Sequence, residues 1–241
     1  MGQTPSIFPL GDAAITLELG HLIDEQLNRK ALAIECRLRA RSFPGMKDVI
    51  VAYSSVTIFY DPVEIRGSVR GLEGSIYKYV CGVLEEVYAE VAMDTSPVAD
   101  GTGTFRRIPV CYGGQFGPDL EEMSRARQMT PADIIRVHCG TIYRVYMVGF
   151  LPGFPYLGKL DPRLQLARKE RPVPVVAGGV GIAGHQTGIY PVNSPGGWQI
   201  IGRTPIKLFD PAITPPVKFS IGDHVEFYPI SEEEFRSFCP E

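Results

Sequence analysis

Near the amino terminus, hydrophobic residues first recur at every second position and then at the spacing of a helix. Residues 15–19 alternate between apolar and polar side chains, which predicts a strand with one buried face. From Asp24, a residue suited to cap a helix, apolar residues recur at helical spacing as far as Leu38. A short strand through residues 7–8 is expected to pair with the first, so the chain should begin as strand, strand, helix.

The same two patterns return further along. Residues 49–53 and 56–60 predict two paired strands, stopped by Asp61-Pro62. A second long helix should follow, with an apolar stripe made of Val69, Leu72, Ile76, Val80, Val83, Val87 and Val91. Together these elements predict a ββαββα domain of the α+β class over residues 1–92, with both helices on one face of a four-stranded antiparallel sheet.

A change of pattern marks a second domain. Residues 93–104 have neither period and are rich in Asp, Thr, Ser, Pro and Gly, which predicts a linker. Beyond it, Pro118 is expected at the first position of a short helix, and Thr130-Pro131 should begin another. The strand candidates are 107–112, 143–148, 173–176, 189–190, 198–201, 206–209 and 225–228. Many short strands between turn residues predict a mainly β, closed or nearly closed barrel over residues 105–241.

Charge and cysteine content narrow the partners and the compartment. With 24 basic and 27 acidic residues the formal charge is −3, which offers no global attraction for nucleic acid or an anionic membrane. The five cysteines are odd in number and never arranged as Cys-x-x-Cys, as suits a reducing compartment. No apolar run approaches membrane-spanning length, and the first residues lack the order of a signal peptide. We therefore expect a cytoplasmic protein without nucleic acid or membrane partners.

A Gly-x-Gly-x-x-Gly pattern occurs at Gly179, Gly181 and Gly184. In dinucleotide-binding domains this pattern opens a helix, but Gly188 and Pro191 follow it here and are incompatible with that helix. A tight β-corner is the better interpretation. The chain also has no P-loop motif, so any nucleotide would bind in another way.

Four clusters in the second domain mix glycine, proline and aromatic residues. They are VCYGGQFGPDL from residue 110, GFLPGFPYLG from 149, GIAGHQTGIYP from 181 and SPGGWQIIGRT from 194. Glycines expose backbone amides, prolines fix loops and aromatic rings supply apolar walls, which together favour a preformed pocket. The alternative is that they are turns sealing the ends of the barrel. Likewise, the basic run at 168–171 could meet an anionic ligand or a partner subunit, or form a solvated face.

Single residues offer several candidates for chemistry. Arg203 could hold a carboxylate or phosphate, or form a surface ion pair. His138 ends a predicted helix, where the dipole favours the cation, and is an acid/base candidate as well as a terminal-turn residue; Asp119 lies at a helix start that stabilises a carboxylate in any case. Cys111 and Cys139 are expected to be small buried side chains. The histidines and cysteines lack metal-binding spacing, so no metal site is expected.

The four clusters, in this order, resemble the family that includes the B subunit of bacterial 5-oxoprolinase, the Kip-type histidine kinase inhibitor and the matching half of the urea amidolyase carboxyltransferase region. The resemblance begins with LGDAAITLELG, continues through FPGMKDV and SSVTIFYDP, and ends with GDHVEF. It implies an amino-terminal α+β domain joined to a cyclophilin-like β-barrel. Where relatives tend to have Pro-Arg and VPAGSV, this chain has Arg171-Pro172 and VVAGGV.

The resemblance implies a reaction, the opening of the lactam 5-oxoproline to glutamate with ATP and Mg²⁺. An unstrained lactam carbonyl is a poor electrophile, so phosphorylation of its oxygen supplies a leaving group and the site must stabilise that charge. Backbone amides at 113–114 and 196–197 are expected to do this with Arg203, while Gln186 and Thr187 orient the ring amide. The full set comprises Tyr112, Gly113, Gly114, Phe150, Gly153, Phe154, Tyr156, Gln186, Thr187, Tyr190, Gly196, Gly197 and Trp198 for substrate binding, and Arg203, His138 and Asp119 for catalysis.

The resemblance also implies partners. Proteins like this work with a homologous C subunit and, in 5-oxoprolinase, with an A subunit, so the chain alone is expected to be inactive. Two other functions remain open: inhibition of a sensor histidine kinase, and service as half of a biotin-dependent carboxyltransferase acting on a urea-like substrate. No biotin-lysine motif is present in this chain.

Overall fold

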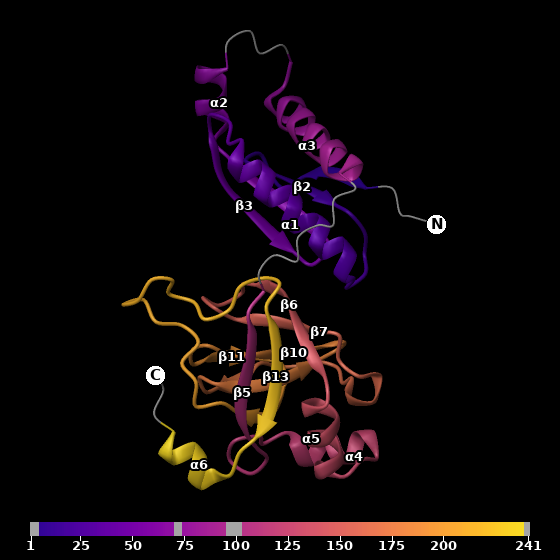
Figure 1. The fold of residues 1–241 in the computed structure, drawn as a ribbon, viewed down its shortest axis with the longest axis vertical. Helices are drawn as coiled ribbons and strands as arrows, with labels where there is room; N and C mark the ends of the chain where they lie inside the picture. Colours follow the sequence, from indigo (N-terminus) through magenta and orange to yellow (C-terminus); the bar gives the residue numbers. More distant parts are fainter. Residues whose placement is uncertain (1–4, 70–73, 95–102, 239–241) are drawn as a thin grey trace. The chain divides into compact units, whose positions relative to one another are not determined.

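The chain divides into two compact units. The structure is a computed structural model, and it describes residues 5–69, 74–94 and 103–238. The units are Met1–Gly101 and Thr102–Glu241, and Figure 1 draws them in colours that run from indigo to yellow. Residues 95–102 of the predicted linker lie outside the described residues. No helix among the described residues is both long and apolar enough to span a bilayer.

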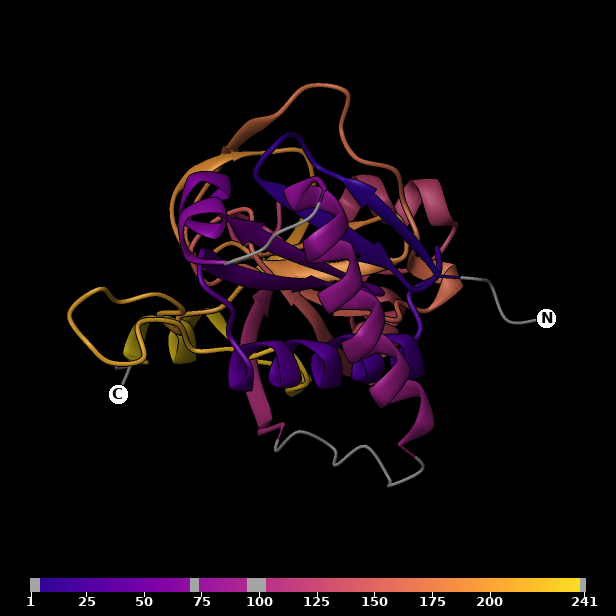
Figure 2. The ribbon, with the colours of Figure 1, turned by 90° about the horizontal axis from the view of Figure 1, so that it is seen from above.

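The first unit is an antiparallel sheet with two long helices packed on it. Its strands are β1 (Ser6–Pro9), β2 (Ala14–Glu18), β3 (Met46–Ala52) and β4 (Ser55–Tyr60), in the order β1-β2-β4-β3. Ile15 on β2 faces Ile58 on β4, which faces Val49 on β3, so a buried row crosses the sheet. Helices α1 (Glu25–Ala40) and α3 (Ile76–Met93) contact this sheet and lie side by side (Figures 1 and 2). The predicted four-stranded antiparallel sheet is confirmed.

The prediction of one long helix after β4 was wrong in one respect. A separate helix, α2 (Pro62–Ser68), precedes α3, and residues 70–73, including Leu72 of the expected stripe, lie outside the described residues. Asp61 ends β4 but also caps α2, because its carboxylate accepts the amides of Val63 and Glu64. A strand-stopping Asp-Pro pair therefore also begins a helix. In α3 the buried stripe passes through Leu84 rather than Val83.

The second unit is a closed seven-stranded barrel. Its strands are β5 (Phe105–Tyr112), β6 (Ile142–Val148), β7 (Pro155–Gly158), β9 (Gly179–Ala183), β10 (Gln186–Ile189), β12 (Gln199–Arg203) and β13 (His224–Pro229). They run in the order β10-β7-β6-β13-β5-β12-β9, and β9 pairs with β10 to close the ring. Among the pairs formed by these seven strands, only β5–β13 is parallel. Val110, Val145 and Ile182 belong to the apolar core of this barrel. The prediction of a closed or nearly closed barrel is confirmed.

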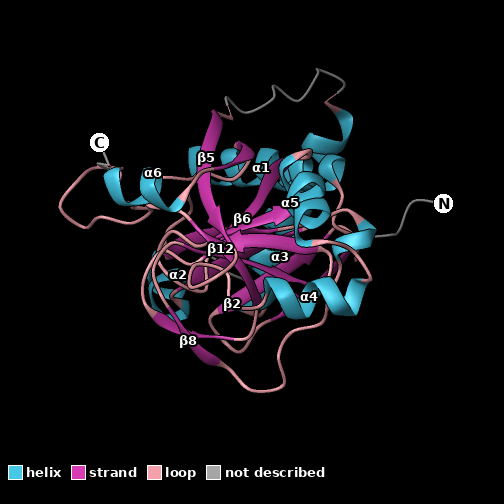
Figure 3. Ribbon diagram, turned by 90° about the horizontal axis from the view of Figure 1, so that it is seen from below, coloured by secondary structure: helices cyan, strands magenta, loops and turns pink. Residues whose placement is uncertain are grey.

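Short elements surround the barrel. They are α4 (Leu120–Arg127), α5 (Pro131–Cys139), the 3₁₀ turn η1 (Pro162–Leu164), the β8 (Val173–Val175) and β11 (Ser194–Gly196) ribbon, and α6 (Glu232–Ser237). Thr130 caps α5 through the amide of Asp133, as predicted. Pro118 is not the first residue of α4, which begins two positions later after Asp119. Figure 3 shows α4 and α5 as neighbouring cyan helices.

Glycine- and proline-rich strands account for most of the differences from prediction. β7, β9 and β11 were missed because Pro155, Gly179 and Gly196 favour turns locally, whereas pairing with distant strands makes them extended. α6 was also missed, and the predicted strand at 206–209 is only a single bridge between Phe209 and Val217. The expected β-corner is confirmed: the β9–β10 hairpin turns at Gly184, where φ is +56°.

Candidate functional site

A buried polar network lies inside the barrel. The Nδ1 atom of His138 lies 2.8 Å from the hydroxyl of Tyr112, and Nε2 lies 3.0 Å from Oγ1 of Thr187. The Thr187 hydroxyl donates its hydrogen to the carbonyl of Gly181 at 3.0 Å. Thr187 can therefore only accept from His138, so Nε2 carries the proton and Nδ1 accepts from Tyr112. This network defines one neutral tautomer of His138.

Burial determines the charge state of this network. It lowers the pKa of His138 to about 3 and raises the pKa of Tyr112 well above its ordinary value. The imidazole also stacks on Phe227, with ring centroids 4.6 Å apart. The expected preference for the cation at the end of α5 is overridden by desolvation. His138 is a neutral residue of the barrel interior, with both ring nitrogens hydrogen-bonded.

Asp119 connects the start of α4 to strand β12. Its amide donates to the carbonyl of Ile200 at 3.0 Å, and its Oδ2 accepts the amide of Ile200 at 2.6 Å. The same oxygen lies 2.7 Å from Nζ of Lys169. The Lys169 amide in turn donates to the carbonyl of Gly197 at 2.7 Å, which brings the 168–171 segment against the Pro-Gly-Gly-Trp turn. Lys169 was not among the predicted site residues, although the basic run was the signal that could have found it.

The aromatic residues differ from the expected pocket wall. Phe154 and Tyr190 are each 1% exposed, and with Trp198 they form a second core outside the barrel core. The Phe154 ring centroid lies 5.1 Å from that of Tyr190 and 5.3 Å from that of Trp198, both edge-on. These three rings therefore bury one another and form a packed cluster rather than an open pocket wall. Phe150 (φ +68°) remains 64% exposed and Tyr156 is partly exposed.

Some of the predicted glycines allow turns and others allow close packing. Gly113 (φ +72°) turns the chain after β5, and its amide donates to the carbonyl of Ile201 at 3.1 Å, so this amide is engaged within the protein. Gly114 continues the turn at φ +51°. A Cβ on Gly196 would lie 2.3 Å from the hydroxyl of Tyr190, and a Cβ on Gly153 (φ +83°) would lie 3.2 Å from the carbonyl oxygen of Leu208. Gly113 therefore allows the turn after β5, and Gly196 allows close packing against Tyr190.

Arg203 lies on the outer side of β12. Its Nε donates to the carbonyl of Ala177 at 2.8 Å, and its guanidinium lies 5.6 Å from the ring centroid of Phe235 on α6. A second cation, Arg168, lies 5.9 Å from the ring centroid of Trp198. Gln186 is a partly buried residue of β10. The expected residues thus fall into four main groups: the His138 network, Asp119 with Gly197 joined through Lys169, the second core of Phe154, Tyr190 and Trp198, and Arg203.

The side chains that the structure brings together limit which metal ions or nucleotides the chain could bind. Among the described residues, no cluster of three His, Cys, Asp or Glu side chains could bind a metal ion. Among the expected site segments, a basic surface that could meet the phosphates of ATP is formed by Arg168 and Lys169 beside the turn at Gly197. Lysine and arginine suit phosphate oxygens, but Lys169 is already paired with Asp119, so an anion would have to compete with that carboxylate.

An α+β domain followed by a closed barrel with glycine-rich loops is the architecture of carboxyltransferase-type domains. The family model for the carboxyltransferase domain, subdomain C and D, matches residues 5–219. The chain belongs to this family, as its motifs indicated.

Individual relatives agree with this assignment. The chain is 42% identical to the B subunit of 5-oxoprolinase from Bacillus subtilis over 233 residues, which cover 96% of this chain and 95% of that protein. The crystal structure of TTHA0988 superposes with a TM-score of 0.73 at 32% identity over 90% of this chain, which spans 40% of that longer chain. The Kluyveromyces lactis urea amidolyase superposes with a TM-score of 0.75 at 21% identity over 96% of this chain and 15% of its own, and confirms the fold.

Proposed function

We propose that this chain is the B subunit of an ATP-dependent 5-oxoprolinase complex, which opens 5-oxo-L-proline to L-glutamate together with an A subunit and a homologous C subunit. The match with the B subunit of the Bacillus subtilis 5-oxoprolinase carries the proposal, because it runs over 96% of this chain and 95% of that protein. By contrast, this chain matches only 15% of the urea amidolyase chain, as expected when two proteins share one domain of a larger enzyme.

The composition of the site supports a subunit rather than a complete enzyme. His138, the only histidine among the expected catalytic residues, is neutral and enclosed, and the described residues contain no metal-binding cluster. Opening a lactam with ATP requires stabilisation of the developing charge on the carbonyl oxygen and the phosphoryl group. In this proposal Arg203 and Lys169 contribute positive charge, and the partner subunits supply the remaining groups and the ATP site with Mg²⁺.

A reconstitution experiment tests the proposal. Glutamate release from 5-oxoproline is measured with this chain alone, with the A and C subunits alone, and with all three together, each with and without ATP. We expect ATP-dependent release only in the complete mixture. Equal release when this chain is omitted would contradict the proposal.

Arg203→Ala in the reconstituted complex tests the site. We expect a loss of about tenfold or more in kcat, the order of effect of a removed charge-stabilising donor. The matched control is Arg66→Ala, which removes an exposed arginine from α2 in the other unit and should leave turnover unchanged. Unchanged turnover in Arg203→Ala would remove Arg203 from the site while leaving the assignment to the complex intact.

Kinase inhibition and biotin-dependent carboxyl transfer stay predictions, and capture of the chain from native cells separates them. Co-purification of A and C subunits agrees with the proposed function. Capture of a sensor histidine kinase without these subunits would favour the inhibitor, and capture of a biotin carrier protein would favour the carboxyltransferase.

A further inference from the structure

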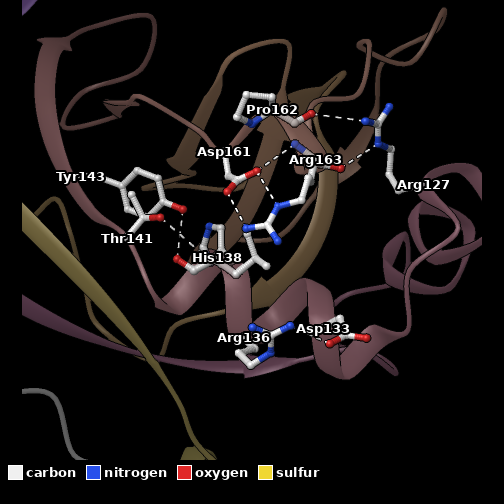
Figure 4. Close-up of polar contacts among 10 residues, drawn as sticks. Arg127, Asp133, Arg136, His138, Thr141, Tyr143, Asp161, Pro162 and Arg163 are labelled. Atoms are coloured by element: carbon white, nitrogen blue, oxygen red, sulfur yellow. Dashed lines mark hydrogen bonds and ion pairs between the residues drawn. The ribbon is translucent and has the colours of Figure 1, made fainter.

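An arginine-lined hollow lies where α4 meets α5. It has a volume of about 510 Å³, within the range of roughly 300–1,000 Å³ that is usual for small-ligand sites. We call it the arginine pocket, and its lining residues are Arg127, Gln128, Met129, Thr130, Asp133, Arg136 and Arg163. Figure 4 shows the three arginines arriving from α4, α5 and the η1 turn. None of these three arginines is among the residues to which the proposed function gives a role.

Arg127 is the distinctive member of the arginine pocket. Its Nε donates to the carbonyl of Arg163 at 2.7 Å, and one Nη donates to the carbonyl of Pro162 at 3.2 Å. Within residues 5–69, 74–94 and 103–238, no carboxylate forms an ion pair with Arg127. The two carbonyls hold the guanidinium in place without neutralising it, so its remaining N–H groups can bind an external acceptor.

The other two arginines are each oriented by one carboxylate. Arg163 makes a two-point contact with Asp161, at 3.0 Å from Nε and 2.7 Å from Nη2, and Arg136 donates to Asp133 at 2.8 Å. Each of these guanidiniums keeps further N–H groups, since a guanidinium has five. Because the side chains are held before a ligand arrives, less conformational entropy is lost on binding.

The charges in the arginine pocket favour an anion. Three guanidiniums face two carboxylates, Asp133 and Asp161, which leaves one net positive charge. The neighbouring arginine lowers the pKa of each carboxyl group, that of Asp161 to about 2, so both acids stay ionised at neutral pH. A neutral or cationic ligand would leave Arg127 without a counterion.

We propose that the arginine pocket binds a phosphate group, either as inorganic phosphate or as the phosphate of a small phosphomonoester. A tetrahedral dianion presents three acceptor oxygens in different directions, which suits a hollow lined by guanidiniums from three elements. A single carboxylate presents two oxygens in one plane and satisfies one arginine fork. The volume of about 510 Å³ also leaves room for an organic group attached to the phosphate.

Calorimetric titration of the 241-residue chain tests this site. Inorganic phosphate, glycerol phosphate and sodium chloride of matched ionic strength are added separately. Phosphate binding that sodium chloride does not reproduce is expected, in the millimolar range for a partly exposed site. If inorganic phosphate binds as tightly as glycerol phosphate, free phosphate is the source; tighter binding of glycerol phosphate identifies a phosphomonoester. A response equal to that of sodium chloride for both phosphates would overturn the proposal.

Arg127→Gln and Arg125→Gln form the matched pair of variants. Both remove one charge from the last turn of α4, but Arg125 does not line the arginine pocket. Loss of one charged hydrogen-bonding group should weaken phosphate binding about ten- to hundredfold in Arg127→Gln, whereas Arg125→Gln should stay within about twofold of the unmodified chain.

Arg136→Gln is a second pocket variant that keeps the proposal testable if Arg127→Gln misfolds. The Arg136 side chain is exposed and, within the part of the chain that the structure describes, it bonds to Asp133 alone. Arg136→Gln should also weaken binding, with an unchanged far-ultraviolet circular dichroism spectrum. Equal weakening in Arg125→Gln, or undiminished binding in both pocket variants, would overturn the proposal.

Discussion

The carboxylate of Asp119 accepts the amide of Ile200 at 2.6 Å while it pairs with Lys169 at 2.7 Å. The side chains of Asp119 and Lys169 are only 12% and 21% exposed. A carboxylate with two such partners holds together three segments that are far apart in the sequence: the start of α4, the basic run and β12. Removing it leaves a poorly solvated ammonium and an amide without its acceptor.

We therefore predict that Asp119→Ala lowers the free energy of unfolding by about 2–4 kcal/mol. Urea denaturation of the 241-residue chain, followed by the fluorescence of Trp198, measures this change. Glu226→Gln serves as the control, because the Glu226 side chain pairs with the exposed Arg107, and its loss should change stability by less than about 1 kcal/mol. Equal effects of the two substitutions would contradict the proposed connecting role.

Acidic pH should destabilise the barrel through His138. The folded-state pKa of His138 is about 3, below the ordinary value of 6.5, so between these values the unfolded chain binds a proton that the folded chain does not. The free energy of unfolding should therefore decrease as pH falls from about 6.5 towards 3, with a contribution from His138 of up to about 1.4 kcal/mol per pH unit.

Denaturation at several pH values, with His138→Gln for comparison, tests this dependence. In the variant, the free energy of unfolding should fall less steeply with decreasing pH, by up to about 1.4 kcal/mol per pH unit. Because the variant could fail to fold, the chemical shift of the His138 ring in the unmodified chain provides a second measurement. A titration midpoint above pH 6 would show that the imidazole is accessible to water.

The second core predicts opposite behaviour of two phenylalanines in one motif. Phe154→Ala should lower the free energy of unfolding by about 3–5 kcal/mol, because Phe154 is 1% exposed and packs against Tyr190 and Trp198. Phe150→Ala removes a ring that is 64% exposed and should change stability by less than about 1 kcal/mol. Similar losses at both positions would contradict the packing described.

Two glycines should also respond in opposite directions to alanine. A Cβ on Gly188 would lie 2.9 Å from both the Phe154 ring and the carbonyl of Pro155, so Gly188→Ala should cost about 1–3 kcal/mol. Gly82 lies within α3 with open space around it, so Gly82→Ala should stabilise by about 0.5–1 kcal/mol. Thermal unfolding distinguishes them, and a stabilising Gly188→Ala would show that the second core is loosely packed.

Local sequence patterns predicted the helices and strands whose structure depends on residues close together in the sequence. The alternation through Ile15 and the helical spacing after Asp24 indicated β2 and α1, because side-chain direction in strands and helices follows sequence position. The family motifs identified the family for a related reason, since they are continuous segments that can be compared residue by residue.

The chain by itself therefore determined the antiparallel sheet, the barrel class and the family. Only the tertiary structure decided which polar groups meet, because Asp119 with Lys169, His138 with Thr187 and Arg127 with the η1 turn are contacts between segments far apart in the sequence. It also decided that the aromatic rings form a core: a glycine- and proline-rich motif has the same composition whether its rings face a ligand or one another, and closure of the barrel makes that choice.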